Sequence, residues 1–423
     1  MKVIVIGGGW AGCAAAVSAK KQGADVVLLE RTDMLLGTGL VGGIMRNNGR
    51  LSATEELKVM GGGDIFAVIE SNFIHKDIAF PGHSHACLYD VSTMEPIIRR
   101  FLSEQGIGLE MGCRVTDVEM EKAFITAVAG RQSKKEVRFE GDVFIETTGT
   151  AGPPANCVKH GNGCAMCILR CHSFGGRVSI AARAGVAEIN GKKGEQTGAM
   201  SGSCKLHKES LDRDLQKKLT ETGVAVIPLD DHLRLTGKLS LKACQQYAIA
   251  DFETNVILLD TGHAKLMTPF FPLDDLRKIS GLENARFEDP YAGGIGNSVR
   301  YMGMSPRDDA LKVDGVDNLF CAGEKAGLMV GHTEAICTGT LAGVNAVRQA
   351  RGRENLKLPE TSILGDAVTF VREQMQTPDG LGLKFTFSGS VLFERMKQKE
   401  MYTTDITCIA DRVKKAGLHQ ILA

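Results

Sequence analysis

The first thirty residues show an apolar run, a glycine-rich break, a helical stretch and a second apolar run. Val3 to Ile6 is apolar throughout, as expected for a buried parallel strand, and Ala14 to Ala19 has the small residues of a tightly packed helix. Between them, Gly7, Gly9 and Gly12 are spaced as G-x-G-x-x-G. This order of strand, glycine turn and helix is typical of a dinucleotide-binding βαβ unit.

Each glycine has a separate expected role in that unit. Gly7 allows the tight bend, Gly9 lets the backbone approach a diphosphate, and Gly12 lets the helix pack closely on the sheet. The helix N-terminus offers free N–H groups and partial positive charge to the diphosphate. The second strand, Val26 to Leu29, ends at Glu30, whose carboxylate can accept a hydrogen bond from a ribose hydroxyl. The alternative is a plain glycine turn beside a solvated Glu30.

Residue spacing also predicts the elements that follow the first unit. The glycine-dense segment 31–63 and the segment 81–85, which contains Pro-Gly, predict loops. Ser92 and Glu95 form a capping-box pattern, which predicts a helix that ends near Gln105. Three short stretches with strand-like alternation come next, at 109–118, 123–128 and 137–139.

Two later apolar strands are predicted to return to the first sheet. Asp142 to Glu146 runs directly into a Thr147-Thr148-Gly149 turn. Leu319 to Ala322 precedes a helix of small residues that begins near Thr333. The N-terminus of that helix would direct its partial positive charge at the bound cofactor.

The composition limits the class of protein. The chain has 423 residues, 43% of them hydrophobic, which is enough for a large core in two or three domains. Fifty basic and fifty acidic residues give a formal charge of zero, so no global field favours nucleic acid. No apolar run approaches the roughly 20 residues of a membrane span, and the first strand leaves no room for a signal peptide. We therefore expect a cytoplasmic protein without a membrane partner.

Two stretches resemble the glucose-inhibited division protein A superfamily, which includes the flavin- and folate-dependent tRNA uridine methyltransferases. Val5 to Ala16, VIGGGWAGCAAA, is similar to the family's opening, except that Ala14 stands where the family often has Glu. Leu276 to Ala346 carries LRKISGLENARF, SPRDDALKV, NLFCAGEKAG and TGTLAGVNA in the family's order. The resemblance implies an α/β fold, namely a glutathione-reductase-type Rossmann-like domain that binds FAD.

The expected domain organisation combines this resemblance with a change in composition after Gly152. Residues 1–152 and 290–350 would form the two parts of the FAD-binding domain. Residues 153–289 would be an inserted α+β substrate or cap domain, and 351–423 a helical C-terminal tail. Gly293, Gly294 and Gly296 mimic the first motif but lack a strand before and a helix after, so they predict a loop.

The resemblance implies FAD contacts from both halves of that domain. The expected cofactor-binding residues are Gly7, Gly9, Trp10, Ala11, Gly12, Glu30, Arg31, Gly39, Gly42, Val115, Thr148, Gly149, Gly323, Glu324, His332 and Thr333. His332 is also a candidate catalytic residue, because it can hydrogen-bond a flavin carbonyl. His85 is the second candidate, as a proton donor or acceptor near the flavin. A solvated or structural role is the alternative for both histidines.

Two departures from the family pattern bear on tRNA chemistry. The RNA-modifying members carry a cysteine in the glycine-rich loop near the flavin, whereas Leu40 to Asn48, LVGGIMRNN, has none. We also expect the large helical tRNA-binding extension of the longer members to be absent. We therefore expect this chain to share the family's FAD binding but not its tRNA modification.

Four of the twelve cysteines cluster in the inserted region with C-x6-C-x2-C-x3-C spacing: Cys157, Cys164, Cys167 and Cys171. Four thiolates suit zinc or an iron–sulfur cluster. A neighbouring flavin favours a 4Fe-4S cluster, because electrons would pass between the two centres. Structural zinc, a redox disulfide of Cys164 with Cys167, and plain packing remain as alternatives.

These features predict an FAD-dependent oxidoreductase that passes electrons between the flavin and the cysteine-ligated centre or a small-molecule substrate. Three alternatives remain open: folate- and FAD-dependent tRNA uridine modification, a flavin–thiol disulfide reductase, and a non-catalytic electron-transfer partner that holds FAD. The expected partner is a small-molecule substrate or a redox protein rather than nucleic acid. Assembly into a homo-oligomer is left open.

Overall fold

The computed structural model describes most of the chain. It covers residues 1–149, 177–193, 196–197, 199–201, 204–234, 236–237, 239, 245–267, 271–288, 298–300 and 302–423. Within those ranges, none of the helices combines the length and the apolar character needed to cross a lipid bilayer.

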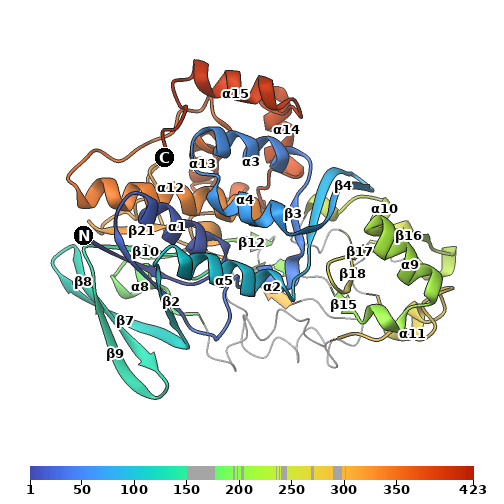
Figure 1. Ribbon diagram of the computed structural model, residues 1–423. Coiled ribbons are helices and arrows are strands. Elements are labelled where there is room, and N and C mark those ends of the chain that lie inside the picture. The colour runs from blue at the N-terminus through green and yellow to red at the C-terminus, as the bar shows by residue number, and fades with distance from the viewer. Residues whose placement is uncertain are drawn as a thin grey trace.

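A five-stranded parallel sheet organises the N-terminal part of the molecule (Figure 1). Its strand order is β21-β10-β1-β2-β6, so the first strand is flanked by β2 on one side and β10 on the other. The strands are β1 (Lys2–Ile6), β2 (Asp25–Glu30), β6 (Gly108–Met111), β10 (Val143–Glu146) and β21 (Leu319–Cys321). The two later strands therefore return to the first sheet, and the α/β prediction is confirmed.

Two helices of small residues pack against each other on this sheet, α1 (Trp10–Lys21) and α12 (His332–Ala350) (Figure 1). A Cβ atom added to Gly339 would lie 2.2 Å from the carbonyl oxygen of Ala11, and one added to Gly343 would lie 2.4 Å from that of Ala15. Since real Cβ atoms do not approach so closely, these positions of α12 require glycine. The close contact joins segments that are more than three hundred residues apart.

A three-stranded antiparallel meander lies on the opposite side of the sheet from α1 and α12 (Figure 1). Ile125 and Val128 of its middle strand are fully buried in the main hydrophobic core. The strands are β7 (Cys113–Glu121), β8 (Phe124–Gln132) and β9 (Lys135–Glu140). The stretches predicted as strands at 123–128 and 137–139 fall on β8 and β9, whereas the stretch 109–118 is divided between β6 of the parallel sheet and β7.

The middle of the chain forms a second unit with its own hydrophobic core. Leu219, Leu258 and Phe271 are buried in this core, which is separate from the main one. The unit is an antiparallel sheet in the order β15-β18-β17-β16, with a helix packed on it. Its elements are β15 (Cys204–Leu206), α9 (Arg213–Thr222), β16 (Val224–Pro228), β17 (Asn255–Asp260) and β18 (Ala264–Leu266). The α+β character expected for an insertion is present in these residues.

A small antiparallel sheet connects this second unit to the first 150 residues. It consists of β3 (Ile44–Arg46), β5 (His83–Tyr89) and β4 (Phe73–Phe80). Phe80 shares a hydrophobic cluster with Tyr247 and Phe252 of the second unit. The predicted domain boundary at residue 152 stays a prediction, because the residues around it are outside the described ranges.

The C-terminal seventy residues are mainly helical, as predicted. The helices are α13 (Ile363–Gln374), α14 (Ser390–Gln398) and α15 (Ile406–Lys415). Figure 1 shows α15 lying over α3 (Gly49–Val59), far from its place in the sequence. The tail is thus packed back onto the N-terminal part of the chain.

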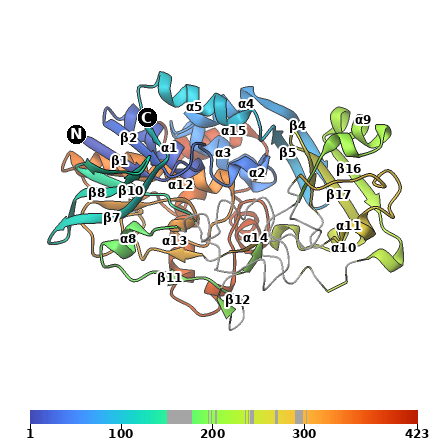
Figure 2. The same ribbon diagram turned by 90° about the horizontal axis from the view of Figure 1, so that it is seen from below.

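The remaining α-helices and strands of the described residues are short. The helices are α2 (Gly39–Gly42), α4 (Asp64–Ser71), α5 (Met94–Glu104), α8 (Ile180–Arg183), α10 (Asp251–Thr254) and α11 (Leu273–Leu276). The strands are β11 (Ile189–Asn190), β12 (Lys192–Lys193), β13 (Gln196–Thr197), β14 (Ala199–Ser201), β19 (Ser298–Arg300) and β20 (Gly303–Met304). In the view of Figure 2, α8, β11 and β12 lie lower than the strands β1, β2 and β10.

The predicted capping box at Ser92 and Glu95 is wrong. Helix α5 has Thr93 at its N-cap, and no side chain caps it. The Glu95 carboxylate instead accepts hydrogen bonds from the backbone N–H of Leu35, at 2.9 Å, and from Arg99. The Glu95 side chain, which a capping box would have used, is engaged in a buried tertiary contact with Leu35.

Two loop predictions are also wrong in part. The glycine-rich segment 31–63 contains the eleven-residue helix α3. The segment 81–85 turns at Gly82 and then enters strand β5 at His83. In both places, tertiary contacts compensate for a low intrinsic propensity to form the helix or strand. Helix α3 carries the buried Arg50, which is paired with Glu334. Strand β5 is hydrogen-bonded to a neighbouring strand on each of its edges.

Candidate cofactor site

Two of the three glycines in the G-x-G-x-x-G motif, Gly7 and Gly12, have no room for a side chain. Gly7 has a φ of +106°, and a Cβ there would lie 2.6 Å from the carbonyl oxygen of Thr147. A Cβ at Gly12 would lie 1.8 Å from the carbonyl oxygen of Gly7. At Gly9 the nearest atom would be the carbonyl oxygen of Leu36, 4.0 Å away. The fold therefore needs Gly7 and Gly12, whereas Gly9 leaves open space at the N-terminus of α1.

Glu30, at the end of β2, is buried and holds the chain around it in place. Its Oε2 accepts a hydrogen bond from the Gly8 N–H at 2.7 Å. Its Oε1 accepts from both the backbone N–H and the hydroxyl of Thr32, at 2.9 and 3.0 Å. Since a carboxylate has about four acceptor positions, Glu30 retains capacity for one further donor, such as a ribose hydroxyl.

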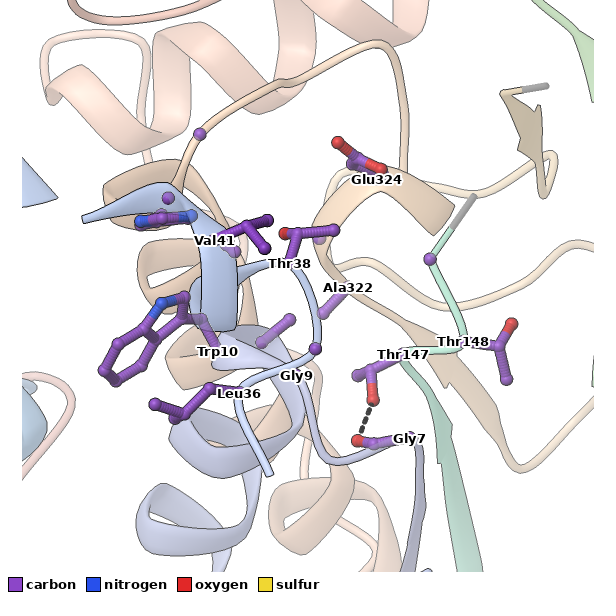
Figure 3. Close-up of a pocket in the computed structure, with 18 of the residues that line it drawn as sticks. Gly7, Gly9, Trp10, Leu36, Thr38, Val41, Thr147, Thr148, Ala322 and Glu324 are labelled. Carbon is purple, nitrogen blue, oxygen red and sulfur yellow. Dashed lines mark hydrogen bonds between the residues drawn. The ribbon is translucent and has the colours of Figure 1, made fainter. Parts of the chain in front are cut away.

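A cleft lies where the strands of the parallel sheet end at their carboxyl termini, which is the edge at which open α/β sheets bind ligands. Figure 3 shows Gly7, Gly9 and Trp10 from the first unit around the same space as Thr148 and Glu324. Residues from both ends of the chain thus form one site.

The structure brings most of the predicted cofactor-binding residues to this cleft. The lining includes Gly7, Gly9, Trp10, Ala11, Glu30, Arg31, Gly42, Val115, Thr148, Gly149, Gly323, Glu324 and His332. Three other predicted residues pack behind it. Gly12 supports the turn, the Gly39 carbonyl accepts a hydrogen bond from the Tyr89 hydroxyl at 2.6 Å, and the Thr333 hydroxyl donates to the Met45 carbonyl at 2.7 Å. The individual contacts to a cofactor stay predictions.

His332 is the first residue of α12, so its imidazole lies at the positive end of the helix dipole. Its ring is packed near Tyr89 and Trp10, with centroid separations of 6.1 and 6.2 Å, and its Nδ1 lies 3.4 Å from the Tyr89 hydroxyl oxygen. Burial raises the pKa of Tyr89, so the phenol stays protonated. A Cβ at Gly42 would lie 1.8 Å from the His332 ring, so glycine at this position makes room for the imidazole.

His85 is not among the residues that line the cleft. Its Nδ1 is 2.7 Å from a carboxylate oxygen of the exposed Asp77. The neighbouring His83 is buried, with Nδ1 2.8 Å from the Asn47 amide and Nε2 3.0 Å from the Gln246 carbonyl oxygen. A catalytic role for His85 stays a prediction, and the structure does not bring it together with His332.

Several cleft residues were missed by the sequence analysis. Tyr247, Lys265 and Met267 reach the cleft from the second unit, and Arg50 and Arg177 also line it. Lys265 is 5% exposed, and its Nζ donates to the Val41 carbonyl at 2.7 Å. No local motif marks these residues, because strand β18 and the short 3-10 helix Gln245–Tyr247 reach the cleft only through tertiary packing.

The predicted metal ligands, Cys157, Cys164, Cys167 and Cys171, lie outside the described residues, as do Gly293, Gly294 and Gly296. In the part of the chain that the structure covers, no three His, Cys, Asp or Glu side chains are grouped as a metal site. Burial raises the pKa of Cys13 and of Cys321 to about 12, so both thiols stay protonated. These two cysteines pack in the main hydrophobic core.

The residues of the cleft suit FAD. A side chain at Gly7 or Gly12 would collide with backbone, and Gly9 leaves space for a diphosphate at a helix N-terminus. Glu30 has acceptor capacity for a ribose, and the N-terminus of α12 provides a second positive pole in the same cleft. These are the groups that a dinucleotide with a flavin requires from its protein.

The sequence model of the family described as glucose inhibited division protein A matches residues 2–234 and 260–354. The two matched stretches cover more than half of the chain. They contain the glycine turn, Glu30, the Thr147-Thr148-Gly149 turn and helix α12.

Curated relatives match a smaller part of the chain. A methylenetetrahydrofolate–tRNA-(uracil-5-)-methyltransferase of Streptococcus sanguinis is 32% identical over 127 residues, which are 30% of this chain and 25% of that protein. A protein of the same name from Thermus thermophilus is 34% identical over 99 residues, covering 23% of this chain and 21% of its own length. The chain thus spans about a quarter of the length of the curated relatives it matches.

Solved structures share the fold over nearly the whole chain. The GidA protein of Aquifex aeolicus has a TM-score of 0.69 at 17% identity and covers 100% of this chain and 73% of its own. A geranylgeranyl bacteriochlorophyll reductase-like protein of Thermoplasma acidophilum has a TM-score of 0.50 at 12% identity, with 98% of both chains covered. Identities this low concern the fold alone. The family match shows that the chain belongs to the glucose inhibited division protein A family of FAD-dependent enzymes.

Proposed function

We propose that this chain binds FAD in the cleft and uses it to modify uridine in tRNA. The observation that carries the proposal is the family match, which extends over the elements that form the cleft. The curated relatives named above are tRNA uracil-5-methyltransferases that take methylenetetrahydrofolate, which supports the substrate class. This reverses the order of the functions expected from the sequence, in which electron transfer to a cysteine-ligated centre came first.

The chemistry of such a reaction needs a reductant. A methylene group transferred from methylenetetrahydrofolate to carbon 5 of uracil becomes a methyl group only if two electrons are added. Reduced FAD supplies these two electrons, so the products are the methylated uridine, tetrahydrofolate and oxidised FAD. The hydrogen on carbon 5 of uracil leaves as a proton.

The chain's own residues would supply positioning, charge and proton transfer in this cleft. Lys265 and the N-terminus of α12 place positive charge on the side that faces the second unit, which favours negative charge on a reduced flavin. Tyr247 and Met267 help to exclude water there. With Nδ1 near the Tyr89 hydroxyl, His332 can move a proton at Nε2.

Methylation of tRNA by the purified chain tests the proposal. FAD-loaded protein is incubated with an unmodified tRNA transcript, methylenetetrahydrofolate and NADH, and nucleosides are then analysed by mass spectrometry. We expect 5-methyluridine that disappears when the folate is omitted. FAD-loaded protein that neither binds the transcript nor produces 5-methyluridine would rule out the proposed substrate.

The cysteine spacing favours electron transfer to a 4Fe-4S cluster as a second candidate function. Protein prepared without oxygen should then contain about four irons and about four acid-labile sulfides per chain. Substitution of Cys164 and Cys167 by serine should remove the iron but leave the FAD bound. Stoichiometric zinc would replace this candidate with a structural metal site, and absence of both metals would leave the disulfide or packing alternatives.

A further inference from the structure

We propose that Arg177 binds a phosphate group in the cleft, and that this group is the diphosphate of the cofactor. Arg177 lines the same cleft as the glycine turn and Thr148. Its side chain is 9% exposed, yet Nε and Nη1 have no hydrogen-bond partner among the residues that the structure describes. Buried donors of this kind are normally satisfied, so a ligand in the cleft is the missing partner. The proposal rests on FAD binding, which is part of the proposed function.

The guanidinium of Arg177 is fixed on one side before any ligand binds. Its Nη2 donates to both carboxylate oxygens of Glu188, at 2.9 and 3.0 Å. A Cβ at Gly303 would lie 2.7 Å from that Nη2 and 2.7 Å from Glu188 Oε2, so the pair is packed directly against backbone. This anchoring uses one nitrogen and leaves the other two for a ligand.

Glu188 is held in turn by a buried lysine. The ammonium of Lys325, which is fully buried, contacts Glu188 and donates to the Ser179 hydroxyl at 2.7 Å. Burial alone would raise the pKa of Glu188, but Lys325 and Arg177 outweigh it and lower that pKa. Glu188 therefore stays charged and serves as a permanent anchor for Arg177.

A second carboxylate places the Arg177 segment at the cleft. Glu146, at the end of β10, accepts hydrogen bonds from the backbone N–H groups of Ile180 and Ala181, at 2.9 and 2.8 Å. It also accepts one from the Thr148 hydroxyl at 2.8 Å. Figure 3 shows Thr148 beside the space that the glycine turn borders. The chain that follows Arg177 is thus attached to the turn that forms the wall of the cleft.

Phosphate is the ligand chemistry that these groups favour. A guanidinium donates to phosphate oxygens through charge-assisted hydrogen bonds, and its planar donors suit several oxygens at once. The N-terminus of α1 contributes backbone N–H groups to the same cleft. Arg177 and α1 would hold a diphosphate together. A phosphate of a bound substrate has the same chemistry, so the two sources must be separated by experiment.

The test compares Arg177→Met with Arg177→Lys and with Arg183→Met. Arg183 lies six residues further on and is exposed, so its substitution removes the same charge without touching the cleft. FAD binding to the unsubstituted chain is measured first by flavin fluorescence, because failure at that step would refute the proposed cofactor site itself. Affinities for FAD, ADP and adenosine, and for a tRNA transcript with FAD saturating, are then measured for each variant at low and high salt.

We expect Arg177→Met to lower the affinity of the chain for FAD and for ADP about tenfold or more at low salt. The loss of affinity should be smaller at high salt. Adenosine, which has no phosphate, should bind unchanged, and Arg177→Lys should lie in between. Loss confined to tRNA would assign Arg177 to a phosphate of the substrate and overturn the cofactor assignment. Equal affinities for Arg177→Met and Arg183→Met with every ligand would overturn the phosphate site altogether. Circular dichroism confirms that each variant is folded.

Discussion

Substitution of Gly12 by alanine is expected to abolish FAD binding and to destabilise the fold. The added Cβ would lie 1.8 Å from the Gly7 carbonyl oxygen and 2.8 Å from the Thr147 hydroxyl oxygen. Helix α1 cannot simply move away, because Gly339 of α12 is packed against the Ala11 carbonyl on its other side. We expect a loss of at least about 3 kcal/mol in the free energy of unfolding, at the upper end for overpacked sites. Urea unfolding and the flavin content of the purified protein measure the two effects.

Gly9→Ala is the matched control for this variant. Gly9 has a φ of −67°, and the nearest atom to a Cβ there would be 4.0 Å away, so alanine fits without strain. We expect stability within about 1 kcal/mol of the original chain, together with weaker FAD binding, because the methyl group occupies the path to the diphosphate. Normal FAD binding by Gly12→Ala would contradict the role of the glycine turn.

Substitution of Arg50 by methionine is expected to cost about 3–5 kcal/mol in the free energy of unfolding, as for other buried ion pairs that lose one partner. The Arg50 Nε lies 3.0 Å from both carboxylate oxygens of Glu334, whose side chain has no solvent exposure. The guanidinium also donates to Asn47, to the Val330 carbonyl and to the Thr386 hydroxyl. Without Arg50, a buried carboxylate would be left without its cation.

Denaturant unfolding of three variants tests this expectation. Arg138→Met removes an exposed arginine that is paired with Glu119 on the meander, and we expect no measurable change. The double variant Arg50→Met with Glu334→Gln removes both charges, and it should recover part of the lost stability because no uncompensated charge remains. If Arg50→Met were as stable as Arg138→Met, the ion pair would contribute nothing to the fold.

The parts of the site that could be predicted from the sequence are those with local signals. The glycine spacing, the acid at Glu30 and the returning strands are each visible within a few neighbouring residues, because a turn, a strand end or a helix start depends on local backbone geometry. The helix at His332 was predicted for the same reason. These features form the part of the cleft at the carboxyl ends of the parallel strands and at the N-terminus of α12.

The other side of the cleft could not be predicted in this way. Lys265 and Tyr247 reach it because the second unit packs on the sheet of β3, β4 and β5, and packing between distant segments leaves no spacing pattern in the chain. Arg177 is held at the cleft by an ion pair with Glu188, which in turn contacts Lys325. Glu188 and Lys325 are far apart in sequence. Local signals also failed where a tertiary contact competed with them, as at Glu95.

The contacts of Glu334 have a consequence for anyone who shortens this protein for expression or crystallisation. Besides Arg50, its Oε1 accepts hydrogen bonds from the Thr386 hydroxyl at 2.7 Å and from the Phe387 backbone N–H at 2.8 Å. A version trimmed after α12 would look complete as a nucleotide-binding module, yet it would lose two of the groups that hold the first turn of that helix. The tail up to Phe387 therefore helps to hold the cofactor pocket together.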